Sequence, residues 1–167
     1  MLWIAVVILI NSAVASLPPR VLGGDPALSC NQSPAENLLP SVVGPMAGSR
    51  PAWFVDGDLF WEHAEHPVKT LWVIARTSAV VRIGGKRVDG PGTVKFRLGQ
   101  DEPFHADLVI ADPSAASAVP GGASPQVMRA YSFIPSHVLY SSPGCWEFTV
   151  QVGSDEVRLV REIKPAR

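Results

Sequence analysis

The stretch S-S-P-G-C-W-E-F-T-V-Q-V-G, residues 141–153, carries the clearest structural signal in the chain. Its Pro-Gly pair is typical of a sharp turn. Large apolar side chains then alternate with polar ones over residues 146–152. Alternation with a period of two places the apolar side chains on one face of a β-strand. A further strand is expected at 156–163, behind a Gly-Ser-Asp turn, so the pattern predicts a C-terminal hairpin with one apolar face.

The rest of the chain repeats this pattern of short strands and turn residues. Further strands are expected at residues 53–55, 59–61, 70–76, 79–83, 93–98, 104–110, 127–134 and 137–140. Strands about ten residues apart predict an antiparallel sandwich or barrel rather than alternating helices and strands. The corner before Cys145 resembles the start of the penultimate strand of immunoglobulin-like domains. We therefore predict an all-β, immunoglobulin-like antiparallel β-sandwich. Residues 113–126 are expected to be a loop too poor in large apolar groups to pack.

The N-terminal third of the chain divides into two parts. Residues 2–10 are an unbroken apolar run, and Ala-Val-Ala follows at 13–15. This arrangement predicts a signal peptide over residues 1–15 and a mature protein that starts at Ser16. A retained N-terminal anchor is the alternative. Residues 16–52 contain seven of the 16 prolines, so we expect an irregular Pro/Gly-rich N-terminal segment, followed by the β-sandwich domain at 53–167.

Composition limits the classes of partner. The chain has 14 basic and 15 acidic residues, a net charge of −1 and no long basic run, which argues against nucleic-acid binding. Hydrophobic residues make up 47% and charged residues 17%, as in a globular domain. The expected location is extracytoplasmic, either secreted or in the cell envelope. Contact with the membrane is expected only through the N-terminal segment, and no cofactor is expected.

Four sequence blocks together resemble a family of small bacterial secreted or lipoprotein-like proteins. These blocks are S-C-N-Q-S-P, K-T-L-W-V, I-G-G-K-R-V-D-G and G-C-W-E-F-T-V-Q-V-G-S-D-E-V-R-L-V, and the resemblance spans residues 29–163. Members pair an N-terminal cysteine with a C-terminal Gly-Cys-Trp-Glu motif across an immunoglobulin-like β-domain. The resemblance implies that fold and a disulfide, and it implies no chemistry.

The two cysteines, Cys30 and Cys145, are expected to form a disulfide. In an exported chain a bridge is the more common state of two such cysteines, because free thiols are oxidised there. The bridge would strap the Pro/Gly-rich segment across the outer face of the C-terminal hairpin. Two buried free thiols are the alternative.

A second candidate site is the run W-E-H-A-E-H-P, residues 61–67. His63 and His66 lie three residues apart and would share one face of a helical turn, as metal ligands can. Glu62 and Glu65 could add a carboxylate or orient an imidazole. On a strand the two histidines would point to opposite faces, and the run would be only a solvated connection.

The tryptophans offer a third candidate. Trp53 and Trp61 flank an Asp-Gly pair that predicts a hairpin, and side by side they could form a platform for a carbohydrate or a protein partner. Trp72 and Trp146 are expected in the core. The chain contains no Gly-x-Ser-x-Gly nucleophile motif, and we predict that it is not an enzyme. The expected function is an exported, non-catalytic binding or structural module of the cell envelope with a protein partner. The alternative is a metal- or carbohydrate-binding β-sandwich that uses His63/His66 or the Trp53/Trp61 hairpin.

Overall fold

The computed structural model describes residues 30–57 and 59–166. The expected signal peptide at 1–15 and the expected start at Ser16 lie outside this range. Among the described residues, no helix has the length and apolarity needed to cross a membrane.

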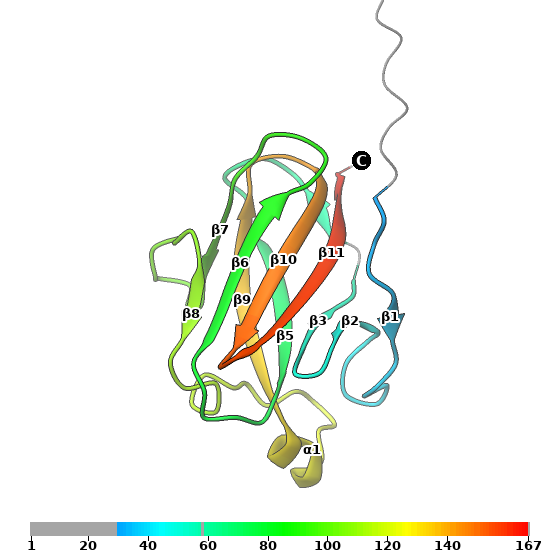
Figure 1. The fold of residues 1–167 in the computed structure, drawn as a ribbon, viewed down its shortest axis with the longest axis vertical. Helices are drawn as coiled ribbons and strands as arrows, with labels where there is room; N and C mark the ends of the chain where they lie inside the picture. Colours follow the sequence, from blue (N-terminus) through cyan, green and yellow to red (C-terminus); the bar gives the residue numbers. More distant parts are fainter. Residues whose placement is uncertain (1–29, 58, 167) are drawn as a thin grey trace, which may run out of the picture.

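The described strands form two sheets (Figure 1). The first sheet has the order β1 (Ala35–Glu36), β2 (Met46–Ser49), β3 (Ala52–Val55), β5 (Val68–Ala75), β9 (Tyr131–Tyr140) and β7 (Val94–Arg97). The second sheet has the order β4 (Phe60–Trp61), β11 (Asp155–Pro165), β10 (Gly144–Val152), β6 (Val81–Arg87) and β8 (Leu108–Ile110). Neighbouring strands are antiparallel except for the short parallel pair of β4 and β11. The prediction of an all-β sandwich is confirmed.

The strand order also corresponds to that of an immunoglobulin-like sandwich. The run β3-β5-β9-β7 has the order of the four-stranded sheet of that fold, and β11-β10-β6 has the order of its three-stranded sheet. Here β8 follows β7 along the chain but pairs with β6 in the other sheet.

The core lies between the inner faces of the two sheets. Trp72 of β5 and Trp146 of β10 are both fully buried, as predicted from their strand positions. Phe148 of β10 contacts the ring of Trp72, with 5.6 Å between the ring centroids. The indole N–H of Trp72 donates to the Ser136 hydroxyl at 2.9 Å, and this hydroxyl also bonds Thr70 at 2.8 Å. The buried polar side chains of Thr70, Trp72 and Ser136 therefore form hydrogen bonds with one another.

The segment predicted to be irregular, residues 16–52, contains part of the first sheet. Strands β1 and β2 lie within it, and β3 begins at Ala52. Met46 and Ala47 of β2 are fully buried, so the domain boundary expected at residue 53 falls inside the sandwich. The prolines on both sides of β2 stand outside the strand, where the missing N–H removes no ladder bond.

The strand expected at 127–134 differs from the structure. Residues Pro125–Ala130 form the short helix α1, and β9 begins only at Tyr131. The side chain of Ser124 caps the helix by accepting from the N–H of Val127 at 3.3 Å, and Pro125 occupies the first turn. Serine followed by proline is a typical helix start, and this local signal prevails over the β-forming residues that follow.

Candidate functional sites

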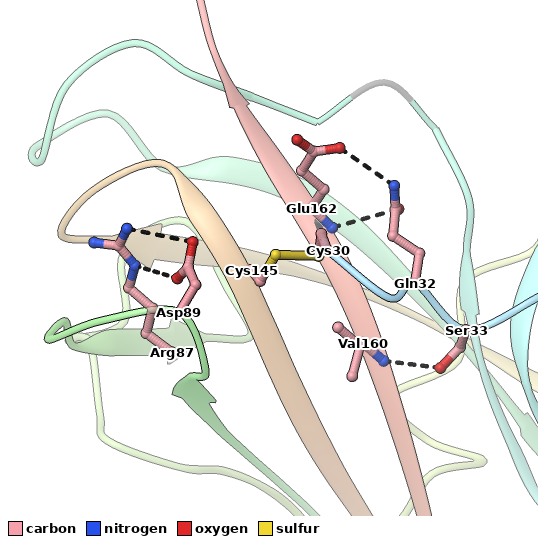
Figure 2. Close-up of a disulfide and its surroundings, with 8 residues drawn as sticks. All are labelled: Cys30, Gln32, Ser33, Arg87, Asp89, Cys145, Val160 and Glu162. Carbon is pink, nitrogen blue, oxygen red and sulfur yellow. Dashed lines mark hydrogen bonds and ion pairs between the residues drawn. A yellow bond between two sulfur atoms is a disulfide. The ribbon is translucent and has the colours of Figure 1, made fainter. Parts of the chain in front are cut away.

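The first candidate site is the disulfide between Cys30 and Cys145, whose Cα atoms are 5.5 Å apart. Figure 2 shows the bridge linking the segment at 30–33 to the start of β10, beside β11. Cys145 has the same parity as Glu147 and Thr149, so its side chain lies on the outer face of the second sheet, as strand alternation predicts. It is nevertheless 5% exposed, which is the expected consequence of a bridge that covers it.

The segment next to Cys30 is also hydrogen-bonded to β11 (Figure 2). The N–H of Ser33 donates to the carbonyl of Val160 at 3.0 Å, and the N–H of Val160 donates to the Ser33 hydroxyl at 2.9 Å. The side chain of Gln32 donates to the Glu162 carboxylate and accepts from the Glu162 N–H. Residues 30–33, called the strap below, therefore satisfy backbone groups of β11 that would otherwise attract another strand.

Gly144 explains the turn that delivers Cys145 into β10. Its φ is +139°, which residues with a side chain rarely adopt. A Cβ built there would lie 2.7 Å from the guanidinium of Arg87 and 2.8 Å from the carboxylate of Asp89. Those two groups form an ion pair with 2.6 Å between Nε and Oδ1, and the pairing holds the pKa of Asp89 below its usual value (Figure 2). The turn thus needs glycine both for its backbone angle and for this close approach.

A second ion pair connects the segment between β3 and β4 to β11. Arg161 points inward and is 6% exposed, and its guanidinium pairs with the carboxylate of Asp56. It also donates to the carbonyl of Ser33 in the strap at 3.2 Å. Burial lowers the pKa of Arg161, and the Asp56 carboxylate supplies the charge that a buried guanidinium requires.

The histidine run forms a compact turn rather than a strand. The N–H of His66 donates to the carbonyl of His63 at 3.0 Å, which brings the two imidazoles to a centroid distance of 5.6 Å. Potential ligand atoms of Glu62, His63 and His66 all lie within 4.8 Å of one another, and all three residues are exposed. Nδ1 of His66 is 3.3 Å from the Glu62 carboxylate. The turn therefore provides the shared face on which the metal prediction depends.

The predicted Trp53/Trp61 platform is not present. Trp53 is 5% exposed and packs in an apolar cluster on the outer face of the first sheet, where its ring contacts Tyr131 at 5.9 Å. Trp61 lies in the second sheet, and its indole N–H donates to the carbonyl of Tyr140 at 3.0 Å. The predicted hairpin is wrong because the chain between β3 and β4 crosses from one sheet to the other, and β3 pairs with β2 and β5.

A cavity that no sequence pattern predicted lies on the outer face of the first sheet. Its volume is about 420 Å³. The side chains that line it include Val55, Lys69, Leu71, Ala118, Phe133 and Pro135. The loop at 117–118 is fixed over β9, because Ala118 donates to the carbonyl of Phe133 at 2.7 Å and the Ser117 hydroxyl accepts from its N–H at 2.9 Å. This wall comes from the loop that the sequence analysis expected not to pack.

A row of basic side chains begins at the same cavity. Lys69 of β5 is the direct cross-strand partner of His137 of β9, which is in turn the partner of Arg97 of β7. Burial and the two neighbouring cations lower the pKa of His137. Within the described chain, Nδ1 of His137 and Nε of Arg97 are buried and have no hydrogen-bond partner. The guanidinium of Arg97 lies over the ring of Phe104, 4.6 Å from its centroid.

Comparisons with known proteins leave the function open. No protein-family model matches the chain, and no curated protein matches it. The chain is similar to a solved structure described as a "Putative Lipoprotein from Bacillus anthracis". It has 13% sequence identity and a TM-score of 0.49, and the match covers 81% of this chain and 86% of that chain. At this level of similarity nothing about binding or activity transfers to this chain.

Proposed function

We propose that this protein is an exported, non-catalytic binding module of the cell envelope whose partner is another protein. The Cys30–Cys145 bridge is the observation that carries this proposal. Disulfides form and persist in oxidising compartments outside the cytoplasm. The apolar run at 2–10 and the Ala-Val-Ala that follows it support export independently of the bridge.

The outer face of the second sheet is the surface proposed for the protein partner. Beyond the strap it carries side chains of both charge signs, with an ion pair between Lys86 and Glu147 at 2.9 Å. Gly84 and Gly85 in β6 lack side chains, and a hollow of about 220 Å³ lies over them, bordered by Thr149. A flat face of mixed charge with a shallow hollow is suited to a protein surface, since opposite charges on a partner can fix its position.

Crosslinking in intact cells tests this proposal. A photo-crosslinking residue is placed at Gln151, which is exposed on the second sheet, and a matched control residue is placed at Lys95, exposed on the first sheet. We expect one discrete protein adduct from position 151 and none from position 95. Equal adducts at both positions, or none from position 151, would contradict the partner surface. Alkylation of the denatured, unreduced protein tests export separately, because a bridged protein offers no free thiol.

Metal binding at His63 and His66, with Glu62 orienting the ring of His66, is the second candidate function, favoured by the distances between the ligand atoms of these three residues. Nδ1 of His63 accepts from the N–H of Glu65 at 3.3 Å, so its Nε2 is the atom left to bind a metal. The contact of Glu62 with Nδ1 of His66 would orient that ring in the same way. Two imidazoles completed by water would suit zinc or copper.

Thermal unfolding with added zinc tests the metal candidate. If the site binds, 100 μM zinc should raise the melting temperature of the wild type, and His63→Ala should abolish the rise. His105→Ala is the control, because His105 lies in the loop that bridges to Phe96, away from this turn. No melting shift and no heat in calorimetry would eliminate this candidate and leave the protein-binding proposal unaffected.

A further inference from the structure

We propose that the cavity on the outer face of the first sheet binds a monoacyl carboxylate, with the acyl chain lying over Leu71 and Pro135 and the carboxylate at Lys69. This site is distinct from the protein-binding face, which lies on the other sheet. Outward positions of a sheet normally carry polar side chains, whereas here Val55, Leu71 and Pro135 are apolar and remain partly exposed. An apolar cavity of 300–1,000 Å³ with a few convergent polar groups is the usual form of a small-ligand site.

The extent of the cavity depends on which segments cover the outer face of the first sheet. One half of the outer face of the first sheet is covered, because the loop at 39–43 and helix α1 pack on the apolar cluster that contains Trp53. No described residue covers the other half in this way, and there Ala118 and Pro120 form a wall beside the open apolar surface. An acyl chain would remove this remaining apolar surface from water. Each methylene buried would tighten binding about fourfold.

Charge explains why the proposed ligand is a carboxylate. Lys69 lines the cavity, and Arg97 adds a second cation two strands away, on the far side of His137. None of these three side chains has an ion pair with a described residue. Burial, more than the neighbouring Arg97 and Lys69, lowers the pKa of His137, so the attraction for an anion comes from the two cations. A neutral amphiphile would gain the apolar contact but not this attraction.

Calorimetry with dodecanoate below its micelle concentration tests the proposal, with dodecanol as the matched neutral probe. We expect saturable binding of one dodecanoate per protein chain. Decanoate should bind about 15-fold more weakly, because it buries two fewer methylenes. Lys69→Gln should weaken dodecanoate two- to fivefold, as for an exposed ion pair, and should leave dodecanol unchanged.

Two variants distinguish binding at a specific site from non-specific adsorption to the protein surface. Arg76→Gln removes one positive charge from an exposed position just past the other end of β5 and should change neither affinity. Leu71→Asp places a carboxylate in the cavity wall and should abolish binding of both probes. Lys69 is exposed, so its variant remains informative even if Leu71→Asp does not fold. The proposal is overturned if dodecanoate gives no saturable heat, or if Lys69→Gln and Arg76→Gln weaken dodecanoate binding equally.

Discussion

Removal of the disulfide by Cys30→Ala/Cys145→Ala should cost most of the stability of the domain. The bridge closes a loop with a sequence separation of 115 residues. In the chain-entropy treatment, a loop of that length lowers the free energy of folding by about 4.8 kcal/mol at 25 °C. For a domain of this size, that corresponds to a fall in melting temperature of roughly 15 °C. The free energy of unfolding of a native protein is usually only 5–15 kcal/mol, so the double variant should be only marginally stable.

Denaturant unfolding of the oxidised wild type and the double variant measures this loss. Hydrogen exchange at the Val160 amide shows whether the strap stays in place, because this N–H donates to the Ser33 hydroxyl. If the bridge acts mainly on the unfolded chain, the Val160 amide should remain protected in the folded variant. If the bridge is needed to hold the strap down, this amide should exchange faster while amides of β10 and β5 stay protected.

Ser33→Ala in the disulfide-bonded protein is the matched control. It removes the hydroxyl that Val160 bonds but leaves the bridge, and it should cost only about 1 kcal/mol. The reasoning would be refuted if the double variant lost less than about 1 kcal/mol, or no more than Ser33→Ala. Either result would mean that the covalent link does not restrict the unfolded chain appreciably.

Three further predictions concern turns and ion pairs. Gly144→Ala should destabilise the protein by more than about 2 kcal/mol in denaturant unfolding, because Gly144 has a positive φ and close neighbours. Gly121 has open space around it, so the control Gly121→Ala should change stability by less than about 0.5 kcal/mol. Asp56→Asn should cost about 3–5 kcal/mol by the same assay, because it leaves the buried Arg161 unpaired. The pKa of Asp89 is lowered, so its ion pair stabilises the fold above the usual pKa near 3.8, and this contribution is lost as pH falls through the lower folded value. Acid unfolding of Asp89→Asn should therefore show a weaker loss of stability at low pH than the wild type.

The C-terminal hairpin could be predicted from sequence because its signals are local. Alternation over residues 146–152 determines which side chains of β10 face the core, and the Gly-Ser-Asp turn sets its pairing with β11. The strand β2 was missed for the opposite reason. Only four residues long, it lies between proline-containing turns, and Met46 and Ala47 give too little periodicity to stand out. Its position depends on pairing with β3, which is a tertiary contact.

The predicted tryptophan hairpin shows how a local turn signal can mislead. An Asp-Gly pair between two apolar triplets favours a hairpin when nothing else acts on it. In the structure, the carboxylate of Asp56 instead pairs with Arg161, and β4 pairs with the end of β11. Leaving the buried guanidinium unpaired would cost about 3–5 kcal/mol, whereas an isolated two-stranded hairpin is at best marginally stable. No pattern within residues 53–61 reveals that partner, which lies about a hundred residues further along the chain.

The basic row on the first sheet shows why a candidate site of this kind is invisible in sequence. Lys69, Arg97 and His137 lie on three separate strands, far apart in the sequence, and no motif links them. They meet only because β9 pairs with β5 on one side and β7 on the other, with His137 opposite both cations. A shift of one residue in either register would turn one cation toward the core. The same registers place Leu71 opposite Pro135, so the apolar surface and the positive charge of the proposed ligand site arise from one pairing pattern. A variant that changed the β5–β9 register would therefore remove both the apolar and the charged parts of that site at once.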